Sequence, residues 1–170
     1  MKNKKNIVLI GMPAVGKSTV GILLAKKTGY NFIDTDILIQ SKEKKRLCEI
    51  IADIGVKNFL TLEQEYLLSL NCTDHVIATG GSAVYSMESM DHLKETGLVI
   101  YLEIGLDHLK KRLSALDSRG VVRAPGQDIT SIYLERTPLY NRYAEIKIKC
   151  DCLTPDQVLS KIINSIRKGI

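Results

Sequence analysis

Residues 6–19 read NIVLIGMPAVGKST and dictate how the chain begins to fold. The run Asn6–Gly11 is rich in Ile and Val, is too short for a helix and ends at a glycine, which predicts a buried strand. Residues Gly11–Ser18 then fit the pattern G-x-x-x-x-G-K-[ST] between that strand and the start of a helix. The stretch therefore predicts a strand, a phosphate-binding loop and a helix in succession.

This loop predicts a site for a nucleoside triphosphate with Mg²⁺. Glycines let the backbone curl so that its N–H groups and the helix N-terminus point at an anion. Lys17 should reach the β- and γ-phosphates, and the Ser18 hydroxyl should bind Mg²⁺. The alternative is a glycine-rich turn with an incidental Lys-Ser pair. The predicted nucleotide-binding residues of the loop are Gly11, Ala14, Val15, Gly16, Lys17, Ser18 and Thr19.

Short apolar runs alternate with amphipathic stretches along the rest of the chain, which indicates an α/β fold with a parallel sheet. The predicted strands are Asn6–Gly11, Phe32–Ile33, His75–Thr79, Leu98–Leu102 and Glu145–Lys149. The predicted helices are Ser18–Lys27, Asp36–Lys44, Leu47–Ile54, Val56–Leu70, Ser86–Lys94, Leu106–Leu116, Ile129–Tyr140 and a last one capped by Thr154 that starts at Pro155.

Length and composition narrow the class of protein. The 170 residues suit one domain, residues 1–170, and 45% hydrophobic residues suit a folded core. The net charge of +5 comes from the two ends of the chain, and few aromatic residues interleave with the basic ones, so we expect no nucleic-acid partner. No apolar run is long enough to span a membrane. We expect a cytoplasmic monomer whose four spread cysteines are reduced thiols.

The remaining motifs distinguish among nucleotide-binding classes. The chain lacks the Asn-Lys-x-Asp guanine reader of regulatory GTPases and is too short for a motor ATPase. A small-molecule kinase remains, and it needs an acidic group for the acceptor hydroxyl and a cationic lid over the phosphates. The aperiodic stretch Asp117–Gln127 is the candidate lid.

A series of further motifs follows the loop in a fixed order. They are Phe32-Ile33-Asp34-Thr35-Asp36, Gly55 with Phe59 and Glu63, Ala78-Thr79-Gly80-Gly81, Arg119, and Arg136-Thr137-Pro138-Leu139-Tyr140. In this order and spacing the chain resembles the shikimate kinase family over nearly its whole length. The resemblance implies a three-layer α/β/α P-loop kinase with a short lid, about residues 117–127. It also implies transfer of a phosphoryl group from ATP to shikimate, in aromatic amino acid biosynthesis.

The resemblance also implies roles for single residues. Asp34 lies near the magnesium, and Asp36 accepts a hydroxyl of the acceptor. Gly80, Gly81 and Ser82 approach that acceptor, and Arg136 binds its carboxylate. Arg119 contacts the transferred phosphoryl group, while Arg112 and Pro155 lie against adenine. Lys17, Asp36 and Arg119 are thus the candidate catalytic residues. Simpler alternatives are that Asp34 and Asp36, or one of them, only cap the next helix, and that Thr79-Gly80-Gly81 is only a turn.

Several positions depart from the family pattern. Leu60 replaces an arginine that binds the acceptor carboxylate, with Lys57 one helical turn away, and Ser82 replaces a third glycine. Val56 replaces an acid, Leu153 replaces a basic residue, and the lid reads Arg119-Gly120-Val121-Val122, so Arg123 is a second candidate for the lid arginine. Two alternatives follow: a kinase of the same fold for another small polyol or hydroxy acid, or a non-catalytic nucleotide-binding regulatory module.

Overall fold

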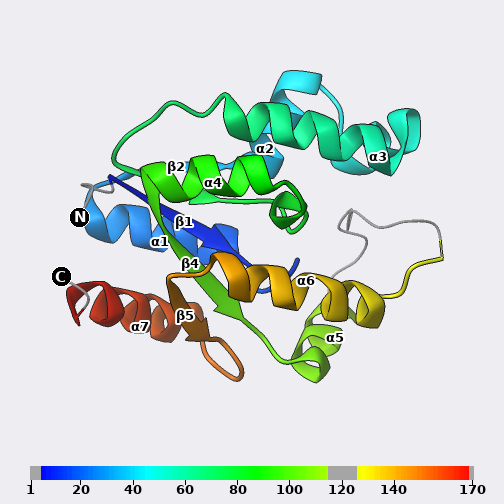
Figure 1. Cartoon of the computed structure of the whole chain (residues 1–170). Helices are drawn as coiled ribbons and strands as arrows, with labels where there is room; N and C mark the ends of the chain where they lie inside the picture. The colour runs from blue at the N-terminus through cyan, green and yellow to red at the C-terminus, as the bar shows by residue number, and fades with distance from the viewer. Residues whose placement is uncertain (1–4, 115–125, 169–170) are drawn as a thin grey trace.

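Five parallel strands form the centre of the computed structural model, which describes residues 5–114 and 126–168 (Figure 1). They are β1 (Asn6–Ile10), β2 (Asn31–Asp34), β3 (His75–Ala78), β4 (Gly97–Glu103) and β5 (Ile146–Lys149). Their order in the sheet is β2-β3-β1-β4-β5. The predicted five-stranded parallel sheet is confirmed, and its strands differ from the predicted ones only at their ends.

The strand β1 lies in the middle of this sheet and is buried along its whole length. Ile7 pairs with Val76 of β3 on one side and with Leu98 of β4 on the other. Helices cover both faces, which explains why β1 is apolar at successive positions instead of alternating. The carboxyl end of β1 therefore opens where the strand order reverses, the usual place for a ligand in such sheets.

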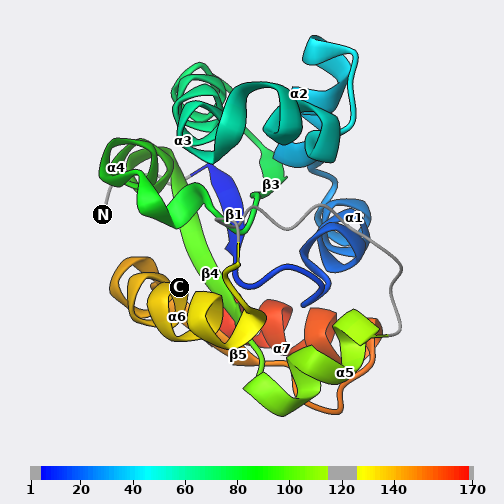
Figure 2. The same ribbon diagram turned by 90° about the vertical axis from the view of Figure 1, so that its right-hand side faces the viewer.

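Helices on the two sides of the sheet complete a three-layer α/β/α fold (Figure 2). The helices α1 (Lys17–Thr28) and α7 (Pro155–Lys168) lie on one face, and α4 (Met87–Thr96) and α6 (Ile129–Tyr143) lie on the other. Beyond the β2 edge, α2 (Thr35–Glu43) packs against α3 (Leu47–Leu68) around a small apolar cluster. The helix α5 (Leu106–Ser114) and the 3₁₀ turn η1 (Ala83–Tyr85) complete the described elements.

The helix boundaries differ from the predicted ones at informative places. The two helices predicted on either side of Gly55 run on as α3, which is interrupted there by a non-helical residue with φ 78° and ψ 162°. The helix α6 continues to Tyr143, three residues past the predicted end, because Tyr143 packs into the core. The predicted cap of α7 is confirmed, since the Thr154 hydroxyl accepts a hydrogen bond from the backbone N–H of Gln157.

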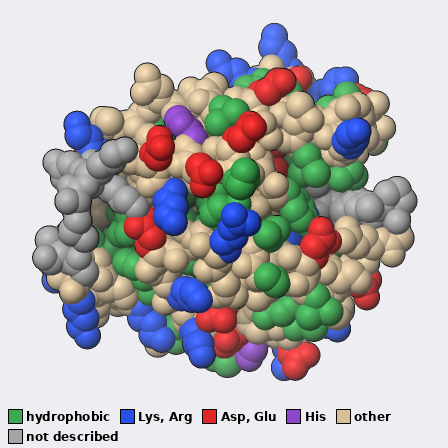
Figure 3. Space-filling view, in the orientation of Figure 1, with side chains coloured by type: hydrophobic (Ala, Val, Ile, Leu, Met, Phe, Trp, Pro, Cys, Tyr) green, Lys and Arg blue, Asp and Glu red, His purple; other side chains and the backbone are tan. Residues whose placement is uncertain are grey.

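The surface carries both signs of charge. On the face shown in Figure 3, basic and acidic side chains are interspersed among apolar and neutral ones. In the part of the chain that the structure describes, none of the helices combines the length and the apolar character needed to span a bilayer.

Candidate active site

The loop between β1 and α1 is wound around the ammonium group of Lys17. Lys17 Nζ donates hydrogen bonds to the carbonyl oxygens of Gly11, at 2.7 Å, and of Met12, at 2.9 Å. Because α1 begins at Lys17, its first backbone N–H groups have no partner within the helix and are available to an anion. The structure thus brings together all residues predicted for the phosphate loop: Gly11, Ala14, Val15, Gly16, Lys17, Ser18 and Thr19.

Lys17 is a buried cation with carboxylates nearby. Burial lowers the pKa of Lys17 to about 8, and the carboxylates of Asp36 and Asp34 partly oppose this effect. Burial destabilises the charged form of an ammonium group, and an anion that binds beside it stabilises that form again. Bound phosphates are therefore expected to raise the pKa of Lys17 again.

The two predicted aspartates lie at the carboxyl end of β2, where α2 begins. Asp34 Oδ1 accepts hydrogen bonds from the backbone N–H groups of Asp36, at 3.0 Å, and Ile37, at 3.2 Å, so Asp34 caps α2. Asp34 thus caps the helix, while its position near the magnesium stays a prediction. Asp36 is half-buried in the first turn of α2, and burial raises its pKa to about 6, against the opposing charge of Lys17. The two carboxylates have different surroundings and can have different roles.

Gly80 lies between the carboxylates of Asp36 and Glu63, just after β3. Its backbone N–H donates to Thr35 Oγ1 at 2.9 Å. A methyl group on Gly80 would lie 2.8 Å from Asp36 Oδ1 and even closer to Glu63 Oε1, so only glycine fits here without displacing either carboxylate. Glu63 is 2% exposed, and burial raises its pKa to about 7. The carboxyl groups of α2 and α3 thus meet at this glycine.

Arg136 is buried in α6, with 1% of its surface exposed. Its Nε donates a hydrogen bond to Tyr85 Oη at 3.0 Å, and its guanidinium carbon lies 5.0 Å from the centre of the Tyr85 ring. One turn further along α6, Tyr140 Oη donates to the carbonyl oxygen of Gly81 at 2.6 Å. These contacts hold α6 against η1 and fix a guanidinium group beside the glycine turn.

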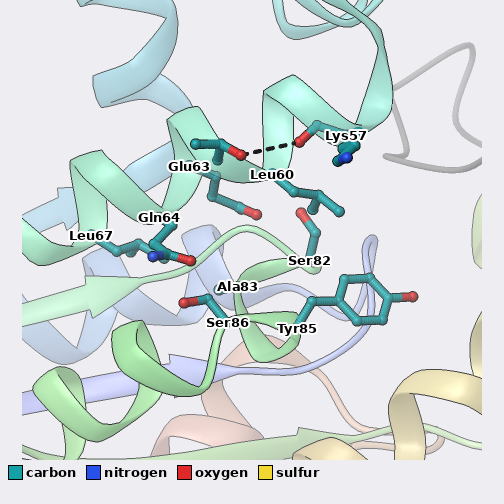
Figure 4. A pocket seen from close by; sticks show the side chains of 10 residues that line it. Lys57, Leu60, Glu63, Gln64, Leu67, Ser82, Ala83, Tyr85 and Ser86 are labelled. Carbon is teal, nitrogen blue, oxygen red and sulfur yellow. Dashed lines mark hydrogen bonds between the residues drawn. The ribbon is translucent and has the colours of Figure 1, made fainter.

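A pocket of about 240 Å³ opens between α3 and η1, next to Glu63 (Figure 4). The helix α3 contributes Lys57, Leu60, Thr61, Glu63, Gln64 and Leu67, and the turn contributes Ser82, Ala83, Tyr85 and Ser86. In Figure 4 the side chains of Glu63 and Ser82 point toward each other across this pocket. Both positions at which the chain departs from the family pattern here, Leu60 and Ser82, therefore line one cavity.

Arg112 lies on the other side of the phosphate loop, in α5. Its guanidinium group donates hydrogen bonds to the carbonyl oxygens of Val15, at 2.8 Å, and Cys150, at 3.2 Å. It thereby joins the loop to the segment between β5 and Pro155, the first residue of α7. The structure brings Arg112 to the nucleotide loop, whereas contact of Arg112 or Pro155 with adenine stays a prediction.

The predicted lid falls largely outside the described residues. Arg119 and Arg123 both lie within residues 115–125, so their assignment as lid arginines stays a prediction.

Reasoning from the sequence did not assign a role to Glu63, Thr35, Tyr85 or Tyr140. A signal for Glu63 was present, because it recurs at a spacing of four with the buried Phe59 and Leu67, on the apolar side of α3. A carboxylate in that position is buried, and buried carboxylates are rare unless they have a function or a partner. The contacts of Tyr85 and Tyr140 depend on how α6 docks on η1, for which the sequence holds no local signal.

The arrangement can bind a polyphosphate and present a carboxylate to an acceptor hydroxyl. The charges of three other residues lie close enough to Lys17 to shift its pKa: Asp36, Glu63 and Arg136. In the described part of the chain, no group of three His, Cys, Asp or Glu side chains could hold a metal ion by itself.

The fold and this site define a P-loop kinase of small molecules. The family model described as shikimate kinase matches residues 13–167. A shikimate kinase of Nostoc sp. is 37% identical over 165 residues, covering 95% of this chain and 90% of its own. One of Alkaliphilus oremlandii is 38% identical, covering 95% and 99%.

Solved structures agree with this assignment. The structure of shikimate kinase from Acinetobacter baumannii in complex with shikimate superimposes with a TM-score of 0.88 at 28% identity, covering 99% of this chain and 96% of that one. A structure of the shikimate kinase from Aquifex aeolicus gives a TM-score of 0.82 at 29% identity, covering 96% and 97%. The chain belongs to the shikimate kinase family. The prediction of an ATP-dependent small-molecule kinase is confirmed.

Proposed function

We propose that the protein transfers the γ-phosphoryl group of ATP to a hydroxyl of shikimate, giving 3-phosphoshikimate and ADP. The observation that carries the proposal is the position of the Asp36 carboxylate, which interacts with the ammonium group of Lys17 in the phosphate loop and adjoins the glycine turn beside Arg136. This position supports a role for Asp36 as proton acceptor, between the loop that would bind the polyphosphate and the cation that would bind a carboxylate. The relatives named shikimate kinase support the choice of acceptor.

The phosphate loop performs the first part of this reaction. Lys17 would leave its contacts with the carbonyl oxygens of Gly11 and Met12 and bind the β- and γ-phosphates. Mg²⁺ would be held by the Ser18 hydroxyl and, directly or through water, by Asp34. Both capping bonds of Asp34 end on Oδ1, so Oδ2 can serve the metal. The metal neutralises phosphate charge when bound, and Lys17 adds to that neutralisation.

The acceptor is held by the groups around the glycine turn. Asp36 accepts the hydrogen bond of the reacting hydroxyl and orients its oxygen toward the γ-phosphorus. Gly80 and Gly81 let backbone come close to the acceptor, Ser82 adds a hydroxyl, and the guanidinium group of Arg136 binds the carboxylate. In phosphoryl transfer, positioning and charge stabilisation dominate, so Asp36 need not be a strong base.

The transferred phosphoryl group needs a cation on the side away from the loop, and we propose Arg119 for it. Comparing Arg119→Ala with Arg123→Ala in steady-state kinetics tests this choice. Arg119→Ala should lower kcat by 10²-fold or more, in the range that the loss of one transition-state donor causes. Arg123→Ala should have a much smaller effect. The reverse order would assign the role to Arg123.

A kinase for another hydroxylated acid is the second candidate, and the observation that favours it is Leu60. An apolar side chain lines the pocket where the family places an arginine, so one of two expected contacts to a carboxylate is absent. A lost hydrogen bond to a charged group costs about 1.5–3 kcal/mol, or roughly 10- to 150-fold in affinity.

One experiment distinguishes the candidates. Purified protein with Mg·ATP is offered shikimate and a panel of other hydroxylated carboxylates and polyols, and ADP release above the background without acceptor is measured. The highest kcat/KM is expected for shikimate. Turnover of another compound without turnover of shikimate would establish the second candidate, and tight ATP binding without any turnover would indicate a regulatory module.

We further propose that residues 1–170 form one domain that works as a monomer in the cytoplasm, where ATP is available. The interspersed charges of the face in Figure 3 support a small-molecule partner over a nucleic acid or a membrane surface. Sedimentation equilibrium should give a mass near the 18.9 kDa of one chain.

A further inference from the structure

The side chain of Arg112 holds one peptide group of the phosphate loop. The helix α5, which carries Arg112, lies beside the loop between β1 and α1 (Figure 2). Arg112 Nη1 donates to the carbonyl oxygen of Val15 at 2.8 Å, and Nη2 donates to that of Cys150 at 3.2 Å. Val15 and Cys150 are both buried. Because a guanidinium group is planar and charged, two such bonds are strong and fix its position.

The contact with Cys150 ties Arg112 to the central sheet. Cys150 directly follows β5, and its backbone N–H donates to the carbonyl oxygen of Glu103, the last residue of β4, at 2.8 Å. Cys150 therefore continues the pairing of these two strands. Through Arg112, the rigid edge of the sheet determines the position of the Val15 carbonyl group.

The peptide group between Val15 and Gly16 determines where one N–H group of the loop points. This peptide bond is trans, and in a trans peptide the C=O and N–H groups point in opposite directions. Since the carbonyl group faces Arg112, the N–H of Gly16 points away from α5. It has no hydrogen-bond partner in the part of the chain that the structure describes. It is therefore a donor that the loop offers to an anion.

Little else holds this peptide group in that orientation. Gly16 has φ 105° and ψ 20°, and glycine rotates more freely about φ than any other residue. A side chain on Gly16 would meet nothing within 4 Å, so no packing fixes this position. A rotation of the peptide group would leave the buried Val15 side chain in place. It would, however, turn a carbonyl oxygen toward the phosphates, which repel it.

We propose that Arg112 is a positioning residue, which orients the Val15–Gly16 peptide so that the Gly16 N–H donates to a phosphate of the nucleotide. The inference rests on the proposed function and deepens it. Arg112 acts through the loop on the phosphate end of the nucleotide, in addition to its predicted contact with adenine. The bond to Val15 also polarises the peptide group, which makes the Gly16 N–H a better donor.

The first test compares a ligand that has a base with one that lacks it. Inorganic tripolyphosphate keeps the three phosphates of ATP, and Arg112→Met keeps most of the side-chain length without a donor. Calorimetry measures the Kd of Mg²⁺ complexes of both ligands. We expect Arg112→Met to raise both Kd values by a similar factor, roughly 10-fold or more, because a bond from a charged donor is lost. The kcat should fall, while the acceptor KM should stay unchanged.

The second test observes the peptide group itself. In protein labelled with ¹⁵N-glycine, saturating Mg·ATP should shift the amide resonance of Gly16 in the wild type and much less in Arg112→Met. Gly29 is the internal reference, because its N–H donates to the carbonyl oxygen of Ala25 at the far end of α1. Its resonance should stay in place in both proteins. A merely structural role of Arg112 would lower the Tm without changing the response of Gly16.

A matched control removes a cation from the same helix. Lys111 is exposed, and Lys111→Met should leave both Kd values unchanged. Arg112→Lys keeps a charged donor for the Val15 carbonyl group and should recover part of the lost affinity for both ligands. Should Arg112→Met fail to fold, Arg112→Lys takes its place, with a smaller change in the same direction.

The outcomes separate the inference from the function beneath it. An Arg112→Met variant that binds ATP more weakly but keeps its affinity for tripolyphosphate and its Gly16 response overturns the inference. Arg112 would then act on adenine alone, and the proposed function would stand. Unchanged affinity for both ligands also overturns the inference. A wild type that neither binds Mg·ATP nor phosphorylates any acceptor overturns the proposed function, and the inference with it.

Discussion

At the scale of single residues, Asp36 and Lys17 carry opposite charges, and their surroundings move both pKa values toward neutrality. Burial raises the pKa of Asp36 to about 6 and lowers that of Lys17 to about 8. Asp36 must be ionised to accept a hydrogen bond from the acceptor, and Lys17 must be charged to bind phosphate. The free enzyme therefore has both groups in their working forms between these two values.

We expect this pair to set the pH dependence of the reaction. The kcat/KM for the acceptor should fall as the pH drops through about 6, because Asp36 becomes protonated. The kcat/KM for Mg·ATP should fall as the pH rises through about 8, because Lys17 loses its charge. Steady-state kinetics from pH 5 to 9 measure both limbs. An acceptor profile that stays flat below pH 6 would contradict the role of Asp36.

Glu63 should make the free protein less stable at neutral and alkaline pH. Burial raises its pKa from 4.5 to about 7, so the native state binds this proton more tightly than the unfolded chain. The stability gained at low pH is lost as the pH rises from about 4.5 to about 7. At pH 8, Glu63→Gln should therefore raise the free energy of unfolding by about 3 kcal/mol, and near pH 4 it should change little.

Urea denaturation at the two pH values measures this effect. Glu65→Gln, an exposed neighbour on the same helix, is the control and should change the stability by less than about 0.5 kcal/mol. Equal stability of Glu63→Gln and wild type at pH 8 would show that the carboxylate is not destabilised by its surroundings. A destabilised group of this kind is typical of a site built for a ligand.

The residue scale also shows where sequence reasoning succeeds and where it stops. The phosphate loop was predictable because it is a short motif with a chemical reason for its spacing. Asp34, Asp36 and Arg136 were singled out by the resemblance to the family, and their roles stay predictions. Sequence could not separate the capping role of Asp34 from that of Asp36, since both stand at the start of one helix. That difference depends on which carboxylate turns toward Lys17.

At the scale of elements, Gly55 interrupts α3, and the part of the helix after this break lines the acceptor pocket. Its φ of 78° and ψ of 162° form a backbone conformation that other residues adopt only at a cost of about 1–3 kcal/mol. Gly55→Ala should lower the free energy of unfolding by that amount. It should also raise the acceptor KM, because Leu60 and Glu63 follow this break.

Thermal or urea unfolding checks the first part of this prediction, and steady-state kinetics check the second. Glu65→Ala is the control, since Glu65 is exposed on the same helix. Should Gly55→Ala keep full stability, α3 would tolerate a regular helix at this point.

Element boundaries followed the sequence wherever a local rule fixes them. Thr154 and Pro155 start α7 as predicted, because the cap and the proline act within one turn. The 3₁₀ turn η1 was missed, since three residues without periodicity carry no helical signal. The helix α6 extends beyond its predicted end because the packing of Tyr143 into the core outweighs local helix propensity.

At the scale of the whole molecule, binding of Mg·ATP should stabilise the fold, since the phosphate loop forms only in the native state. At a concentration of 100 times Kd, the expected gain is about 2.7 kcal/mol, or an increase in Tm of roughly 5–10 °C. Lys17→Ala should remove most of this shift. Lys26→Ala, an exposed lysine of the same helix, should retain it. Differential scanning fluorimetry measures both, and an undiminished shift in Lys17→Ala would contradict the assigned phosphate contact.

The parallel direction of the strands was predictable from the sequence, but their order in the sheet was not. Alternation of apolar runs and amphipathic helices indicates a parallel sheet. The position of β1 between β3 and β4 depends on pairing between strands that are distant in sequence, and no local sequence pattern predicts it.

The central position of β1 has a consequence for the newly synthesised chain. Ile7 pairs with Val76 and Leu98, and Ile10 pairs with Tyr101. A ribosome therefore releases the complete phosphate-binding motif long before the strands that hold it in place have emerged. Because contacts so distant in sequence form slowly, an unfinished chain carries the motif without the means to bind nucleotide. Nucleotide binding thus reports completed synthesis and folding of at least the first four strands.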